Sequence, residues 1–155
     1  TKIIMHLKKT RVRFHAGIVV GRFYSNFREI EELVKMDKRF SIINNNKNLV
    51  SLMSHYKIGI FTFGITTFEA FFVGMPSINI SHSFENDRYA KKIAKYDCMN
   101  YLGHYKRIDF GSLPEEIFKL MNDSKLCLKY TKNARNMIDG KGIQRVAMKI
   151  VELSN

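Results

Sequence analysis

The chain has 155 residues, of which 45% are hydrophobic, and it carries a formal net charge of +12 at pH 7. This length fits one domain with a core of ordinary size, and the hydrophobic content excludes an intrinsically disordered chain. No apolar run reaches the roughly 20 residues of a membrane-spanning helix, and no signal-like segment opens the chain, so we expect a cytoplasmic protein. Because the sequence starts at Thr1 and not at a methionine, we expect a processed protein or a fragment.

The positive charge implies attraction to an anionic partner. Lysines and arginines are scattered along most of the chain, and no tight basic cluster with interleaved aromatic residues marks a nucleic-acid face. The pattern favours an ordinary solvated surface over an anionic small ligand or an anionic membrane surface, and it favours nucleic acid least. The two cysteines, Cys98 and Cys127, lack the C-x-x-C spacing and are expected to be ordinary thiols.

The first part of the chain predicts one strand and one helix. Residues 1–10 mix apolar and basic side chains and fit either a helix or an incomplete strand. Phe14–Val20 predicts a core strand. Asn26 and Glu29 form a capping-box pattern, in which each side chain bonds the backbone of the other residue, so a helix is expected to begin there.

The next segments continue this alternation. Phe40–Ile43 predicts a strand, and a short apolar-faced helix follows with Asn48 as its N-cap. Ile58–Phe63 is an almost uninterrupted apolar run, rich in β-branched and aromatic residues, that is typical of a strand buried on both faces of a parallel sheet. A turn is expected at Gly64.

A second capping-box pattern follows this turn. Thr66 and Glu69 have the required spacing, so they predict the start of a helix over Thr67–Val73. Ser77–Ile80 then predicts a further short strand. The sequence therefore reads as strand, glycine turn, helix and strand, which is the repeating unit of a parallel sheet.

The last part of the chain is mostly helical. Asn86 or Asp87 is expected to cap a helix that ends near Tyr96, and Met99–Leu102 predicts a last short strand. Three further helices are predicted over residues 112–121, 124–138 and 142–153.

Together these segments predict a single α/β domain over residues 1–155, with a Rossmann-like parallel sheet, helices on both faces and a helical C-terminal tail. In such sheets ligands collect at the carboxyl ends of the strands, where helix N-termini offer unpaired N–H groups and partial positive charge. We expect the segment from Gly64 to Thr67 to lie in this crevice.

The motif G-x-T-T-x-E at 64–69, with G-x-P at 74–76 and Glu85–Asn86, resembles the carboxy-terminal half of two-domain GT-B nucleotide-sugar enzymes. The sequence is similar to UDP-sugar hydrolases of the pseudaminic acid pathway and to spore-coat polysaccharide proteins. It resembles the lipid II-forming N-acetylglucosaminyltransferase more distantly. The likeness runs from about Phe14 to the end of the chain and includes Asp139–Gly142 and Arg145.

This resemblance implies a site for a UDP-sugar. The glutamate that matches Glu69 accepts hydrogen bonds from the ribose hydroxyls, although Glu69 could instead only complete its capping box. Gly64, Thr66 and Thr67 would surround the diphosphate, and an ordinary strand-to-helix turn is the alternative.

Other family positions fall on three further segments. Gly21 follows the first strand, where the turn approaches the nucleotide, and Phe23 could stack on a ligand or pack in the core. Asn48 and Leu49 lie where the family holds the uracil edge through backbone groups. The loop after Ile80 lies where relatives place residues that contact the sugar. The full set of candidate substrate-binding residues is Gly21, Phe23, Asn48, Leu49, Gly64, Thr66, Thr67, Glu69, Glu85, Asn86 and Asp87.

The sugar-contacting position at Asp87 differs from the family pattern, where glutamine is usual. A carboxylate accepts hydrogen bonds but cannot donate them, so we expect a different sugar preference. The five histidines lack zinc-site spacing, and His82 is expected to be a loop residue and not a base. We assign no catalytic residue, cofactor or metal ion to the sequence.

The resemblance also implies missing parts. A complete GT-B half begins with one more strand and a glycine-rich turn, for which the chain has no room ahead of Phe14. Residues 1–10 would then be the helix after that strand, and the catalytic N-terminal domain would be absent. We expect the chain alone to be inactive, and the sequence does not decide whether the whole enzyme transfers the sugar or hydrolyses the UDP-sugar.

Two other classes of function remain as alternatives. One is a non-catalytic nucleotide-sensing or interaction domain, and the other is a basic nucleic-acid-binding module.

Overall fold

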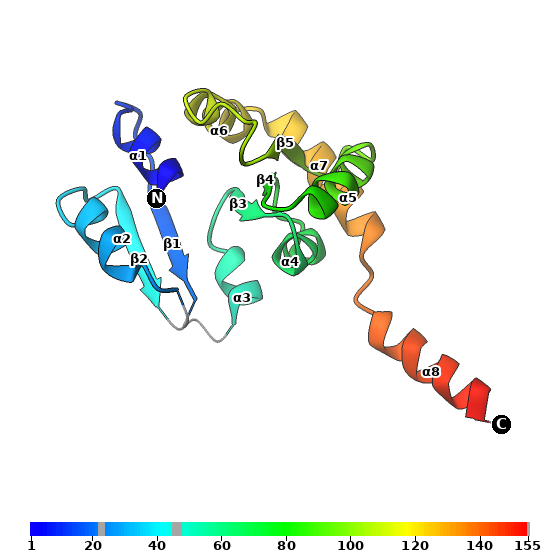
Figure 1. Ribbon diagram of the computed structural model, residues 1–155. Helices are drawn as coiled ribbons and strands as arrows, with labels where there is room; N and C mark the ends of the chain where they lie inside the picture. Colours follow the sequence, from blue (N-terminus) through cyan, green and yellow to red (C-terminus); the bar gives the residue numbers. More distant parts are fainter. Residues whose placement is uncertain (22–23, 45–47, 155) are drawn as a thin grey trace.

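The computed structural model describes residues 1–21, 24–44 and 48–154 (Figure 1). The helices in this part of the chain are α1 (Lys2–Lys8), α2 (Phe27–Val34), α3 (Leu49–Met53), α4 (Ile65–Val73), α5 (Phe84–Ala94), α6 (Leu113–Asn122), α7 (Ser124–Met137) and α8 (Gly142–Ser154). The strands are β1 (Ala16–Val20), β2 (Phe40–Asn44), β3 (Gly59–Thr62), β4 (Ser77–Ser81) and β5 (Asn100–His104). The predicted alternation of strands and helices and the helical tail are confirmed.

Every strand pair is parallel, as predicted, but the strands form two sheets instead of one. β1 pairs with β2, with Ala16 opposite Phe40. β4 lies between β3 and β5, with Gly59 opposite Ser77 and Ile78 opposite Asn100. Figure 1 shows β1 and β2 with α1 and α2 on one side, and β3–β5 with α4–α7 on the other.

The strand that is buried on both faces is β4 and not, as we expected, β3. All five residues of β4 are buried, whereas Ile60 and Phe61 in β3 are half-buried and Thr62 is exposed. The reason is their place in the sheet, because β4 has a paired strand on each side and β3 has one only on the β4 side.

Helices close the core on both sides of the strands. The largest apolar cluster joins α1, α2 and α6 to the strands and includes Leu7, Ile30, Ile78 and Leu120. A second cluster surrounds Phe71 of α4, which is completely buried. α7 packs on α4. These contacts leave the carboxyl ends of β3 and β4 as a common edge, from which α4 and α5 begin.

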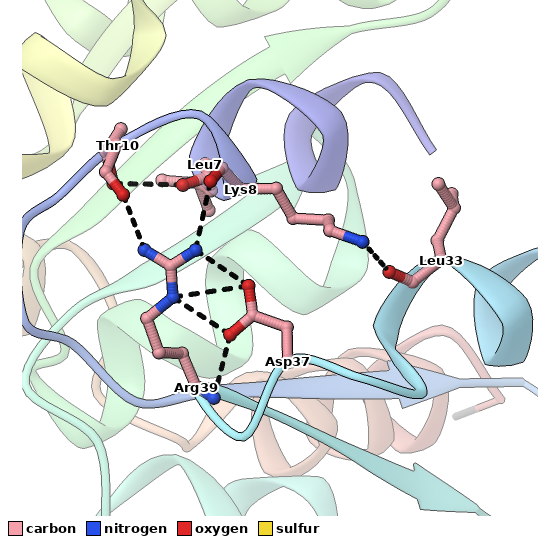
Figure 2. A network of polar contacts seen from close by, with 6 residues as sticks. All are labelled: Leu7, Lys8, Thr10, Leu33, Asp37 and Arg39. Carbon is pink, nitrogen blue, oxygen red and sulfur yellow. Dashed lines mark hydrogen bonds and ion pairs between the residues drawn. The ribbon is translucent and has the colours of Figure 1, made fainter.

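Residues 2–8 form a helix, which settles the alternative left by the sequence. Its end is fixed to the start of β2 by Arg39, whose guanidinium donates to the carbonyl oxygens of Lys8 (3.0 Å) and Thr10 (2.7 Å) and to Asp37 (2.7 Å) (Figure 2). The Lys8 ammonium group also donates to the carbonyl of Leu33. The hydrogen-bonded Arg39 guanidinium lowers the pKa of Asp37 to about 2.

Two predicted helix caps differ in the structure. Asn26 is the N-cap of α2, but its side chain makes no capping hydrogen bond. α5 begins earlier than expected, because Ser83 is its N-cap and its hydroxyl accepts from the N–H of Asn86 at 3.1 Å. Asn86 and Asp87 therefore lie in the first turn of α5 and do not cap it.

The C-terminal helix α8 extends away from the other elements (Figure 1), and all of its residues are exposed. Exposed apolar side chains include Ile143, Val146 and Ile150. No helix in the described part of the chain has the length and apolar character needed to cross a bilayer.

We predict that Arg39→Gln lowers the free energy of unfolding at pH 6, and that its difference from the parent shrinks as the pH falls from about 4 to 2. Because the folded-state pKa of Asp37 is depressed, the stabilisation by this carboxylate is present above its ordinary pKa and is lost through the folded one. Urea unfolding at pH 6 and pH 2.5 measures this. Lys35→Gln, at an exposed ion pair with Glu32, is the control and should change little. An Arg39→Gln effect of equal size at both pH values would contradict the prediction.

Candidate functional site

The turn after β3 is built differently from the predicted capping box. α4 begins at Ile65 with Gly64 as its N-cap, and the hydroxyl of Thr67 accepts a hydrogen bond from the Gly64 N–H at 3.3 Å. The Thr66 and Glu69 side chains do not cap the helix, so the alternative reading of Glu69 as a capping residue is wrong. Its carboxylate makes no hydrogen bond or ion pair with the residues that the structure describes.

A buried polar network supports this turn from beneath. The Thr67 hydroxyl donates to the side-chain oxygen of Asn79 at 2.7 Å, and the Asn79 amide donates to the Ser77 hydroxyl at 2.8 Å. All three residues are completely buried. Thr67 therefore positions the turn, and its hydroxyl is committed to the protein instead of the diphosphate contact that we expected.

The face of the turn that is directed to solvent is open and offers backbone donors. A Cβ atom added at Gly64 would meet only the Thr62 carbonyl oxygen, at 3.9 Å. The Thr67 N–H bonds the Gly64 carbonyl. The N–H groups of Ile65 and Thr66 are in the first turn of a helix, so they have no intrahelical acceptor.

The Glu69 side chain projects from the same side of α4 as the side chains of Ile65 and Thr66. Residues three and four positions apart are neighbours on a helix surface, which places Glu69 one turn, about 5.4 Å, beyond Thr66 and Ile65. Ile65 is 80% exposed and Glu69 is half-buried. The turn thus combines N–H donors with partial positive charge and a carboxylate acceptor.

The start of α5 lies beside this turn. The Asn86 amide donates to the Phe63 carbonyl at 3.2 Å, which ties α5 to the end of β3. Asp87 is 6% exposed, and its carboxylate accepts from Lys91 at 2.7 Å and from the Tyr101 hydroxyl at 2.5 Å. Lys91 and then Tyr101 lower the pKa of Asp87 by hydrogen bonding.

The same contact acts on Tyr101. Burial, and then the hydrogen bond to Asp87, raises the pKa of the Tyr101 phenol to about 12. Its oxygen also lies 2.7 Å from the Ser81 hydroxyl. Both oxygens of Asp87 are thus engaged inside the protein, so Asp87 links α5 to β5, and Glu85 is the exposed carboxylate of this turn of α5.

A hollow of about 360 Å³ lies at the carboxyl ends of the larger sheet. Residues from the ends of all three strands and from α1 surround it, among them Thr62, Ile80, Tyr105 and Lys2. It borders the strand end that leads into the Gly64 turn. The structure therefore places an open concave surface next to the candidate anion-binding turn.

Of the remaining candidate residues, the described ones follow the strands of the smaller sheet in the chain. Gly21 follows β1 and is exposed, and Asn48 caps α3 by accepting from the Ser51 N–H at 2.9 Å, as predicted. Leu49 and Thr66 line one cavity between the two sheets. Phe23 lies outside the described residues, so its predicted role stays a prediction.

Sequence reasoning missed an aromatic and cationic group next to α5. The Phe84 ring stacks on the His104 imidazole, with 4.7 Å between ring centroids and an interplanar angle of 5°. The Arg107 guanidinium lies over Phe84 at 5.4 Å. Phe84 is 64% exposed. No motif brings these residues together, because they come from separate elements.

The side chains that usually hold metals do not form a site here. No group of three histidine, cysteine or acidic side chains within the described ranges could hold a metal ion. Cys98 and Cys127 are free thiols. Burial raises the pKa of Cys98 to about 11, so this thiol stays protonated at neutral pH.

The fold is that of a Rossmann-like α/β domain of the GT-B type. The chain superposes on WaaG, a glycosyltransferase involved in lipopolysaccharide biosynthesis, with a TM-score of 0.73 and 19% identity, over 98% of this chain and 42% of WaaG. The sequence is 24% identical over 135 residues to the spore coat polysaccharide biosynthesis protein SpsG of Bacillus subtilis (strain 168). That match covers 87% of this chain and 40% of SpsG.

No protein-family model matches the chain. The two likenesses confirm the resemblance to a GT-B-like carboxy-terminal half that the motif at 64–69 indicated. The chain spans about two fifths of the length of each of these relatives. The more distant likeness to the lipid II-forming enzyme stays a prediction.

We predict that Asn79→Ala lowers the free energy of unfolding by about 2 to 4 kcal/mol, because it leaves buried hydroxyls without their partners and opens a cavity. Chemical denaturation measures this change, and faster amide exchange at Gly64 should accompany it. Asn136→Ala, an exposed position on α7, is the matched control and should stay within about 0.5 kcal/mol. Equal effects of the two substitutions would show that Asn79 does not support the turn.

Proposed function

We propose that this chain is the nucleotide-sugar-binding domain of a two-domain, cytoplasmic GT-B-type enzyme that takes a UDP-sugar in the synthesis of surface polysaccharide or nonulosonic acid. The names of SpsG and WaaG, both proteins of polysaccharide biosynthesis, support the pathway class. The observation that carries the proposal is the Gly64 turn, which combines an open backbone surface, helix N–H donors and the Glu69 carboxylate, to which no residue in the described part of the chain bonds.

The diphosphate of the ligand would bind at the start of α4. The N–H groups of Ile65 and Thr66 lie at the positive end of the helix dipole, which favours an anion. Because Gly64 has no side chain, a phosphate oxygen can approach its backbone closely. The buried hydrogen bonds of Thr67 keep the donors in place before the ligand arrives.

The ribose would bind one turn further along α4. Its two neighbouring hydroxyls are donors, and an ionised carboxylate accepts two hydrogen bonds at once. The Glu69 carboxylate would be available for these hydrogen bonds, because no other contact in the described part of the chain competes for it. The sugar would then extend towards α5, where Glu85 is exposed and Asn86 is held against Phe63.

A second domain would supply the reacting groups. We assign no catalytic residue to this chain, and the relatives are more than twice as long as the matched region. A domain that faces the carboxyl edge would bring the acid, base or acceptor hydroxyl to the anomeric carbon. The start of α4 would stabilise the charge on the departing UDP. Whether water or a sugar hydroxyl attacks would depend on that domain.

We predict that the isolated chain binds UDP more tightly than uridine, with a Kd of about 0.1 to 1 mM, which corresponds to roughly 4 to 5.5 kcal/mol. The diphosphate is the part of UDP that the helix start recognises, so its loss should weaken binding. Calorimetry or ligand-observed NMR at physiological salt measures both ligands. Inorganic pyrophosphate is the control for attraction to the net charge of +12. Equal affinities for UDP and uridine would exclude the anion site.

We predict that Glu69→Gln weakens UDP binding by roughly 1 to 2 kcal/mol and leaves the Tm nearly unchanged. Glutamine is a neutral acceptor, and Glu69 does not cap α4, so only ligand contacts should change. Glu31→Gln on α2 is the matched control, since it changes the net charge equally at an exposed position away from the turn. Unchanged affinity in a folded Glu69→Gln protein would remove Glu69 from the site.

A further inference from the structure

The loop after β5 is built around the side chain of His104. This imidazole is 3% exposed, and its Nδ1 atom accepts a hydrogen bond from the Lys106 N–H at 3.3 Å. The His104 carbonyl oxygen accepts from the Arg107 N–H at 2.8 Å. The Tyr105 N–H donates to the Ser81 carbonyl at 2.9 Å, which ties the loop to the end of β4. The loop is therefore fixed at the carboxyl ends of β4 and β5.

His104 also holds the ring of Phe84. Phe84 is the first residue of α5, and its ring lies parallel to the imidazole, at an angle of 5° and with 4.7 Å between the ring centroids. Because Phe84 is 64% exposed, its ring is fixed by stacking on a buried partner and not by enclosure in the core. The loops that follow β4 and β5 therefore meet at this pair of rings.

Arg107 is held on the same group, and the protein does not pair its charge. Its guanidinium lies over the Phe84 ring, 5.4 Å from the centroid. The side chain is exposed, and no carboxylate in the described part of the chain bonds it. Lys91 and then Tyr101 lower the pKa of Asp87 by hydrogen bonding. The charge of Arg107 lowers it further, but the Asp87 carboxylate is already bonded to those two groups.

A second cation lies on the same loop. The Lys106 ammonium group is 5.9 Å from the centroid of the Tyr105 ring, and Lys106 is exposed. A cation over an aromatic ring is attracted by the face of the ring, and this contact leaves the N–H groups at the edge of a guanidinium available. The planar fork of these N–H groups matches the two oxygens of a carboxylate. The loop therefore offers donors for an anion that are held in place before it binds.

This group of residues adjoins the place proposed for the sugar. Phe84 is in the same turn of α5 as Glu85 and Asn86. The Asn86 amide donates to the Phe63 carbonyl, which holds this turn against the end of β3. A ligand with its diphosphate at the start of α4 and its sugar directed to α5 would bring the substituents of the sugar to Phe84 and Arg107.

We propose that Arg107, held by Phe84 and His104, is a subsite for a carboxylate on the sugar of the nucleotide ligand, so that the substrate class is a UDP-linked acidic sugar. This inference rests on the proposed function and adds which sugar the site selects. Arg107 donates the two parallel hydrogen bonds of a bidentate pair to the carboxylate. Phe84 and His104 are positioning residues, which keep the guanidinium at the carboxyl ends of the strands.

The test compares UDP-glucuronic acid with UDP-glucose, which differ only in a carboxylate that replaces a hydroxymethyl group. Calorimetry on the chain measures both ligands at about 0.15 M salt, where exposed charges more than ~8 Å apart are largely screened. We expect the acidic sugar nucleotide to bind about tenfold more tightly. Arg107→Gln should remove most of this preference. Phe84→Leu keeps an apolar side chain but removes both ring contacts, so it should lower the preference as well.

Arg28→Gln on α2 is the matched control, because it removes the same charge at an exposed position in the other half of the molecule and should keep the preference. Thermal unfolding of each variant shows that it is folded. Equal affinities of the parent chain for the two ligands would overturn the subsite and leave the proposed function standing. A preference that Arg107→Gln lowers no more than Arg28→Gln does would also overturn it and would assign the preference to net charge. If neither ligand binds, the proposed function and the subsite both fail.

Discussion

The hydrogen bonds of the buried Asn79 side chain are the constraint on which the candidate site depends. A buried amide is costly unless its groups are satisfied, and Thr67 and Ser77 satisfy this one. Thr67 in turn accepts the Gly64 N–H and so sets where α4 begins. A chain of hydrogen bonds thus runs from the centre of the larger sheet to the turn, and the donors of the turn are fixed without help from a ligand.

The positive charge of the chain acts together with this geometry. α4 directs its N-terminus to the carboxyl edge, and the cations of Lys2, Lys106 and Arg107 lie near the same edge, beside Phe110, Tyr105 and Phe84. An anion at the turn would therefore be attracted both by the positive end of the α4 dipole and by the positive field of these cations. Of the carboxylates near this edge, Asp87 is paired with Lys91, Glu69 lies one turn along α4, and Glu85 is exposed on the first turn of α5.

The candidate site spans both sheets, and this makes their separation important. Gly21 and Asn48 follow strands of the smaller sheet, and the Gly64 turn and Asn86 follow β3 and β4 of the larger one. Among the described residues no backbone hydrogen bond joins the two sheets, so side-chain packing in the shared apolar cluster sets the distance between these groups. Under the proposed function, the place of the uracil end of the ligand relative to its diphosphate end therefore depends on how the two sheets pack on each other.

The sequence by itself determined the class of fold and the order of the elements, and it supplied the segment on which the candidate site is proposed. Apolar residues that recur with the period of a strand or of a helix, together with the glycine after Ile58–Phe63, were enough to predict these elements. Such patterns reflect local geometry and burial. Three features were decided only by tertiary structure. Thr67 replaced Glu69 as the residue that reaches back to the helix start, since burial against Asn79 outweighed the capping pattern. The Asp87 carboxylate bonds the Tyr101 hydroxyl, and β3 is only half-buried. Each of these features depends on a partner that is distant in sequence, so no local pattern predicts it.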